Sequence, residues 1–150
     1  MDQQQVIEQI AALGGVDVLE AGGDYYLFYD PQDGRPVEQL HPFATVVTAD
    51  RHDTASNLDR EGVYRLNFGV AKKTFESILG PRPSWPKDGA MVVETGHDYT
   101  ALNKLMPHPV YSPQSWMCVL NPSEETLESI RPLLVEAYER AAESHRKRSG

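Results

Sequence analysis

Apolar side chains recur every three or four residues at both ends of the chain, which is the spacing of an amphipathic helix. The first stripe lies in residues 3–13, where Asp2 precedes the helix as its cap and Gln5 follows three residues later. The second stripe follows Asn121, a capping residue type, with Pro122 at the first helical position. The sequence therefore predicts a helix at each end, each with one apolar face to bury.

Short apolar runs between these two helices predict strands, because they are rich in β-branched and aromatic residues and are bounded by glycine, proline and aspartate. Two of them are joined by Gly22-Gly23, a signal for a hairpin turn. The predicted strands cover residues 16–18, 25–29, 43–48, 63–68, 91–93 and 116–120. Adjacent antiparallel strands with helices at both ends indicate an α+β fold, in which helices cover an antiparallel sheet.

The remaining segments are two short helices and several loops. Apolar spacing predicts helices over residues 71–79 and over 98–106, the latter with Asp98 as its cap. Prolines indicate a turn at 31–36, a loop at 81–89 and an extended segment at 107–113. The polar segment 49–62 is long for a connection between strands, and loops of that length are commonly functional. We expect one domain over residues 1–150, with a basic tail at about 143–150.

Two stretches carry a family resemblance. The sequence VYRLNFGVAKKTFESILG (Val63–Gly80) and the stretch from Leu105 to Ala142 resemble a family of unknown function known chiefly from actinomycetes. That family is in turn similar to the MmcQ/YjbR-like proteins, which share a strand with tryptophan near its start followed by a long C-terminal helix. The resemblance implies an MmcQ/YjbR-like α+β fold. DNA binding has been suggested for such domains from their shape.

Composition and charge narrow the classes of function. The chain of 150 residues has a formal charge of −8, and its first 62 residues carry twelve acidic against three basic side chains. An acidic surface repels phosphate backbones, so nucleic-acid binding is disfavoured. No apolar run is long enough to span a membrane, and the N-terminus lacks the pattern of a signal peptide. With a single cysteine, Cys118, the composition fits a cytoplasmic protein.

Motifs for metals, nucleotide cofactors and nucleophilic catalysis are missing from the sequence. The best local group of ligand types is Asp50-Arg51-His52-Asp53, where Arg51 opposes a cation, so we expect no metal site. Without a glycine-rich phosphate loop, no cofactor is expected either. Cys118 lies in the middle of a predicted core strand, where a thiol stays neutral and inert.

A group of polar and aromatic residues remains as a candidate site. The segment before the last strand supplies His97, His108, Tyr111, Gln114 and Trp116, and Arg65 and Asn67 lie on the face of their strand opposite its apolar side chains. Together they can line a cleft whose apolar walls are Tyr26, Phe28 and Trp85. Each residue also has a structural explanation, with Trp116 as a core anchor and Arg65 as the partner of an acid.

Three hypotheses of function follow. The first is a non-catalytic protein that binds a small organic molecule or a protein partner, with Arg65, Asn67, Trp85, His108, Tyr111, Gln114 and Trp116 as the ligand-binding residues. The second is a cofactor-independent enzyme that uses His97 or His108 as acid or base, with Arg65 or Tyr111 steadying an anion. The third is DNA binding through the fold's surface. A homodimer through the aromatic segments also stays open.

Overall fold

The computed structural model describes residues 1–30 and 41–149 and confirms an α+β fold. Six strands form one sheet in the order β1-β2-β3-β4-β6-β5, and every neighbouring pair is antiparallel. The strands are β1 (Val16–Ala21), β2 (Asp24–Tyr29), β3 (Ala44–Val47), β4 (Arg65–Gly69), β5 (Met106–Pro107) and β6 (Trp116–Leu120). The predicted hairpin is present: β1 and β2 pair as antiparallel neighbours, and the turn between them contains Gly22 and Gly23, which both have positive φ.

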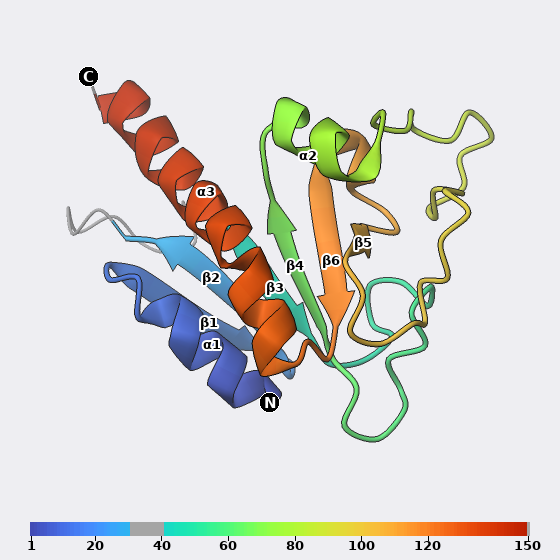
Figure 1. Ribbon diagram of the computed structural model, residues 1–150, viewed down its shortest axis with the longest axis horizontal. Helices are drawn as coiled ribbons and strands as arrows, with labels where there is room; N and C mark the ends of the chain where they lie inside the picture. Colours follow the sequence, from blue (N-terminus) through green and yellow to red (C-terminus); the bar gives the residue numbers. More distant parts are fainter. Residues whose placement is uncertain (31–40, 150) are drawn as a thin grey trace.

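Two helices lie across one face of the sheet (Figure 1). Helix α1 (Gln3–Ala11) begins with the expected capping box, in which Asp2 and Gln5 each accept a hydrogen bond from the other's backbone N–H. Helix α3 (Glu124–Ser149) crosses the strands diagonally, and α2 (Lys72–Leu79) follows β4. The apolar faces of all three helices join the inward side chains of β2, β3, β4 and β6 in one core. This face of the sheet supplies most of the hydrophobic burial.

The opposite face of the sheet carries the polar residues of the strands. Leu66 and Phe68 of β4 point into the helical core, so their neighbours Arg65 and Asn67 point to the other side. Strand register places Asn67 beside Thr45 of β3 and beside Cys118 of β6. A row of side chains therefore crosses the sheet on this second face.

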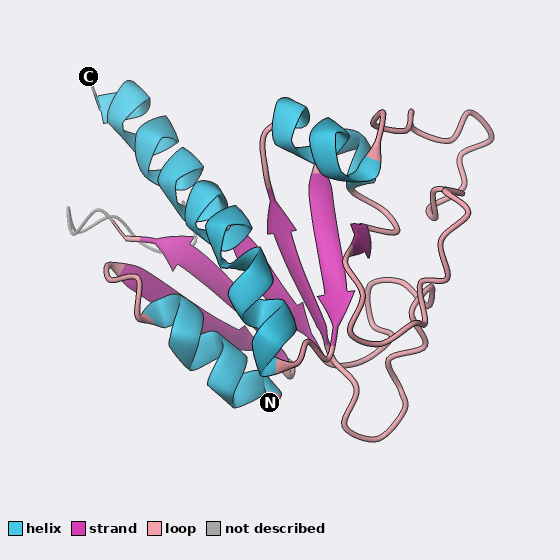
Figure 2. Cartoon of the chain, viewed as in Figure 1, coloured by secondary structure: helices cyan, strands magenta, loops and turns pink. Residues whose placement is uncertain are grey.

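Loops cover the second face of the sheet (Figure 2). The segment between β3 and β4 and the segment between α2 and β6 contribute Leu58, Tyr99 and Met106 to a smaller core against the sheet. Cys118 lies within this core and is fully buried, as expected. These loops leave part of the face uncovered.

Several predicted elements differ in the structure. Residues 91–93 form no strand, and residues 98–106 form no helix, because the chain there runs into β5 and pairs with β6. The segment 107–113 is only partly extended, since Ser112–Gln114 form a 3-10 turn. Helix α3 is capped by Ser123, whose Oγ accepts the Thr126 N–H, and not by Asn121. The side chain of Asn121 instead joins the backbones of Tyr64 and Gly62.

The two ends of the described chain complete the comparison. Helix α3 continues to Ser149, so most of the stretch expected as a tail is helical. The turn expected at 31–36 lies outside the described residues. Among the helices of the described residues, none is both long and apolar enough to cross a membrane.

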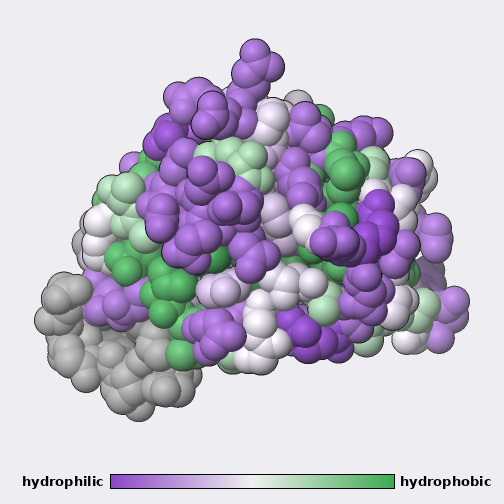
Figure 3. All heavy atoms as spheres, turned by 90° about the horizontal axis from the view of Figure 1, so that it is seen from below, coloured by the Kyte–Doolittle hydropathy of each residue, from purple (hydrophilic) through white to green (hydrophobic). Residues whose placement is uncertain are grey.

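The surface seen from below is mainly hydrophilic in the part that the structure describes (Figure 3). Hydrophobic residues occur there in small separate groups between polar ones. The exposed large apolar side chains of the described residues include Trp85 and Tyr111. Scattered exposed apolar residues are normal on a protein surface and do not by themselves mark an interface.

Candidate functional site

A cavity of about 460 Å³ lies on the second face of the sheet. This volume is in the range of pockets that hold small organic molecules. Residues from β2, β3, β4, β6 and the segments before β3, before β6 and over 49–62 line it: Tyr26, His41, Pro42, Thr45, Val47, His52, Asp53, Arg65, Asn67, His108, Tyr111, Gln114 and Trp116. The mixture of aromatic walls and a few polar groups is typical of a ligand pocket.

Arg65 projects from β4 to the cavity and is only 2% exposed. Its Nη1 and Nη2 donate to the two carboxylate oxygens of Asp53 at 3.1 and 2.9 Å, a bidentate ion pair. Nη1 also donates to Ser56 Oγ, and Nε donates to Asn67 Oδ1. Four of the five guanidinium N–H groups are thus used within the described residues, which leaves one Nη2 hydrogen on the edge shared with Nε.

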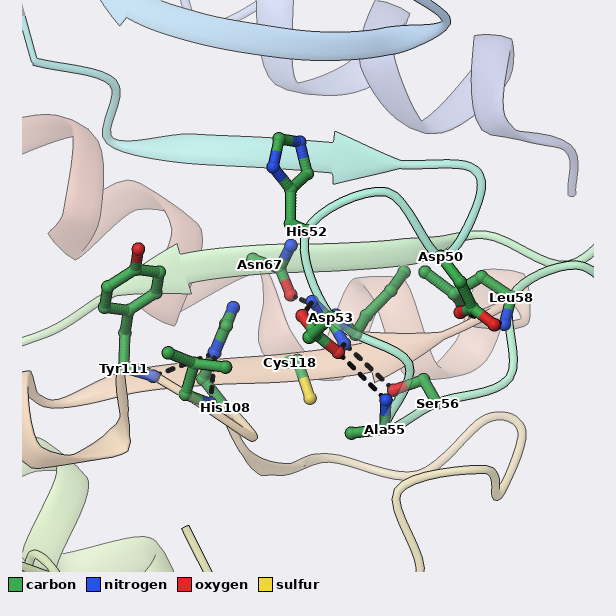
Figure 4. Close-up of polar contacts among 12 residues, drawn as sticks. Asp50, His52, Asp53, Ala55, Ser56, Leu58, Asn67, His108, Tyr111 and Cys118 are labelled. Carbon is green, nitrogen blue, oxygen red and sulfur yellow. Dashed lines mark hydrogen bonds and ion pairs between the residues drawn. The ribbon is translucent and has the colours of Figure 1, made fainter. Parts of the chain in front are cut away.

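Asp53 comes from the 49–62 segment and cancels the charge of Arg65. Hydrogen bonds and the positive charge of Arg65 lower the pKa of Asp53 against the opposing effect of its burial, so the carboxylate stays ionised. Asp53, Ser56 and Asn67 lie together in Figure 4. The ion pair therefore fixes this long loop over the sheet and leaves the site with little net charge.

Asn67 extends the network along the sheet. Its Oδ1 accepts from Arg65, and its Nδ2 donates to Thr45 Oγ1 on β3 at 3.0 Å. The second Nδ2 hydrogen has no acceptor among the described residues, and Asn67 lines the cavity. Asn67 thus offers an N–H donor to a ligand.

The imidazole of His108 is held in one tautomer. Its Nδ1 accepts the backbone N–H groups of Val110 and Tyr111, both at 3.0 Å (Figure 4). An acceptor nitrogen carries no proton, so the hydrogen of the neutral ring is on Nε2. Burial, together with the positive charge of Arg65, lowers the pKa of His108 to about 3. His108 is therefore a neutral N–H donor throughout the physiological range, and our expectation that a histidine here titrates near neutrality is wrong for His108.

Trp116 supplies an aromatic wall at the start of β6. Its indole lies on the backbone of Gly69, where an added Cβ would be 2.8 Å from Nε1. The rings of Tyr111 and His108 are tilted against each other with their centroids 5.1 Å apart, and Trp116 lies edge to face with His108 at 6.4 Å. Glycine at position 69 thus gives Trp116 its place in the cavity wall.

His52 lies at the opposite side of the cavity, near β2. Its Nε2 is 2.9 Å from Oδ2 of Asp24 and 3.4 Å from Tyr26 Oη. The Asp24 side chain is 2% exposed and also accepts from the Thr48 N–H and from Arg51. Burial opposes ionisation of Asp24, but the bonds from Arg51, Thr48 and His52 lower its pKa overall. Because an ionised carboxylate only accepts, the hydrogen of the neutral His52 ring lies on Nε2, and among the described residues no donor occupies its Nδ1, which can accept a proton.

The structure gathers most of the residues that the sequence singled out. Arg65, Asn67, His108, Tyr111, Gln114 and Trp116 line the cavity together with Tyr26. Three residues lie elsewhere. His97 bonds to Thr95, Phe28 is buried and does not line the cavity, and Trp85 packs edge to face on Tyr111 with 48% of its surface exposed.

Sequence reasoning did not include His52, Asp53 or Thr45 in the site. For His52 and Asp53 the available signal was the length of the polar 49–62 segment. That length points to the segment, but it does not show which residues the side chains contact. Thr45 shares a face with Tyr26 and Asn67 through strand register, which the pairing of β3 with its neighbours reveals.

A metal has no evident ligand set in the part of the chain that the structure describes. No group of three His, Cys, Asp or Glu side chains there is placed to hold an ion. Asp50 and Asp53 each accept backbone N–H groups of their own loop. Burial raises the pKa of the Cys118 thiol to about 12, so it is neither a thiolate ligand nor a nucleophile at neutral pH.

Comparison with known proteins gives one family match. A family model described as a family of unknown function (DUF6194) matches residues 1–150. The search of curated proteins found no match, and neither did the search of solved structures. The resemblance to the MmcQ/YjbR-like proteins therefore stays a prediction.

Proposed function

The chain belongs to the family of unknown function DUF6194, and we propose that its cavity binds a small neutral organic molecule through a carbonyl oxygen. The observation that carries this proposal is the fixed Nε2–H of His108, because two backbone N–H groups occupy its other nitrogen. A donor held in this way is ready for an acceptor oxygen without a change of protonation. Asn67 and Arg65 each have one further N–H beside it.

Charge favours a neutral ligand over an anion. Among the cavity residues that the structure describes, Asp53 and Arg65 carry permanent charges, and they neutralise each other in a bidentate pair. An anionic ligand would lose part of its hydration in the cavity without gaining an unpaired cation, which is costly. Amides, lactams and ketones accept hydrogen bonds without that cost. The rings of Tyr111 and Trp116 suit a flat or cyclic carbon skeleton.

Two probes of the same shape test the proposal. Benzamide and benzoate differ mainly in charge, and titration of ¹⁵N-labelled protein at pH 7.5 follows both. We expect saturable shifts with benzamide at the Trp116 indole and the Asn67 amide, and weaker binding of benzoate. Tighter binding of benzoate would contradict the neutral ligand, and no saturable shift with benzamide at millimolar concentration would contradict the proposed function.

One variant tests the contribution of the His108 Nε2–H donor alone. His108→Asn keeps a side-chain oxygen for the backbone N–H groups of the turn, since asparagine commonly makes such bonds, but its amide is too short to replace Nε2–H. Loss of one hydrogen bond weakens benzamide binding by about tenfold. His97→Asn is the matched control, because His97 lies outside the cavity and should leave the affinity unchanged.

A further inference from the structure

We propose that His52 is a general base that removes a proton from the carbon next to the carbonyl group of the bound molecule. This inference rests on the proposed function, since it needs a carbonyl compound in the cavity. It adds an activity, the cofactor-independent isomerisation of a ketone, and it assigns opposite roles to His52 and His108, two of the three histidines that line the cavity.

The first argument is the orientation of His52. Its Nε2–H is held by Oδ2 of Asp24 at 2.9 Å, and Arg51 donates to both oxygens of the same carboxylate, to Oδ1 at 2.9 Å and to Oδ2 at 3.4 Å. A buried carboxylate that fixes one nitrogen of a cavity histidine leaves the other as a proton acceptor, and it stabilises the imidazolium that forms. Asp24 is suited to this role because its pKa is lowered and it stays charged.

The second argument is that His108 and His52 offer complementary groups, a hydrogen-bond donor and a proton acceptor. His108 stays a donor because its Nδ1 is occupied by two N–H groups, whereas Nδ1 of His52 has no donor within the described part of the chain and can accept a proton. In the view of Figure 4 the two histidines lie on either side of Asn67. The cavity extends from β2 to β6, three strand spacings or about 14 Å between backbones. A ring-sized ketone fits between them.

The chemical step needs no oxidant or cofactor. His52 Nδ1 takes the proton, the electron pair of the C–H bond forms a carbon–carbon double bond, and the π pair of the carbonyl moves to its oxygen. The N–H groups of His108, Asn67 and Arg65 stabilise the negative oxygen. The imidazolium then returns a proton to one of two atoms. Protonation at carbon restores the ketone and exchanges its hydrogen with solvent, and protonation at oxygen gives the enol. The substrate class is a neutral ketone with an acidic C–H bond.

Deuterium exchange measures this step directly. Acetophenone, 1-indanone and 2-cyclohexenone are incubated in D₂O buffer with the full chain, and NMR follows the loss of the C–H signal next to the carbonyl. We expect the wild type to exchange at least one ketone faster than buffer. The His52→Gln variant should lose about a hundredfold in rate, the usual contribution of a general base. His97→Gln should exchange as the wild type does.

The outcomes separate this inference from the proposed function. If benzamide and the ketones bind but no ketone exchanges faster than in buffer, the base assignment is wrong and the binding site stands. Exchange that survives in His52→Gln, or that is lost in His97→Gln, also overturns it. If nothing binds, the proposed function itself fails. A thermal unfolding curve of His52→Gln like that of the wild type, together with unchanged benzamide affinity, shows that lost exchange comes from the missing base.

Discussion

His108 shows how a single side chain sets the chemistry of the cavity. The turn that follows it directs the Val110 and Tyr111 N–H groups onto Nδ1, so the ring satisfies backbone donors and presents Nε2–H. Protonation would break both bonds and would place a second positive charge near Arg65. The residue is therefore a structural element of the turn and a fixed donor at once.

The low pKa of His108 predicts how stability depends on pH. The folded chain holds this group at a pKa of about 3, below its usual value of 6.5, so between these values the unfolded chain binds more protons. The free energy of unfolding should fall as pH falls below about 6.5, by up to about 1.4 kcal/mol per pH unit from this group. Urea denaturation at pH 7 and pH 5 measures the fall. The His108→Asn variant should show a shallower fall, and an unchanged slope would contradict the assignment.

Gly69 makes a second prediction at this scale. Its φ is not in the left-handed region, so the reason for glycine is the Trp116 ring and not the backbone. In Gly69→Ala the new Cβ would lie 2.8 Å from the indole Nε1 and push the ring into the cavity. We expect a loss of about 1–3 kcal/mol in stability and weaker benzamide binding. The shift of the Trp116 indole N–H resonance reports the movement, and a spectrum like the wild type's would contradict it.

At the scale of elements, the loop between β3 and β4 depends on one buried ion pair. Asp53→Asn leaves the Arg65 charge without a partner, and breaking such a pair costs about 3–5 kcal/mol. The double variant Asp53→Leu/Arg65→Met removes both charges and should regain most of that loss. Urea denaturation of wild type, single and double variants tests this. A single variant as stable as the wild type would show that the pair does not hold the loop.

The regular elements were predictable where a local pattern decides them. The strand 116–120 has the bounds that the sequence indicated, and the alternation in β4 correctly separated Arg65 and Asn67 from the apolar residues. The predicted helix at 98–106 failed because pairing of Met106 with Cys118 outweighs a weak apolar spacing. Asn121 looked like a cap, but its side chain joins the backbone across 57 residues, which no local pattern indicates.

At the scale of the whole molecule, the two faces of the sheet differ in role: one packs in the main hydrophobic core, and the other lines the candidate site. One face is buried by α1, α2 and α3, and the other is covered by loops (Figures 1 and 2). These loops leave a cavity of about 460 Å³. The polar residues on the second face indicated such a site from the sequence. The partners of Arg65 and His52 did not follow from it, because Asp53 and Asp24 are 12 and 28 residues away and are brought near by the path of the loop.

The most direct test of the account is the Nε2–H signal of His108 during a benzamide titration. Imidazole ¹H–¹⁵N spectra of the free protein should show the Nε2–H tautomer without titration from pH 5 to 8. On addition of benzamide this proton should move downfield and saturate together with the Asn67 amide, while His97 stays unchanged. A His108 that titrates in this range, or one that does not respond while benzamide binds elsewhere, would contradict the central claim that this donor holds the ligand.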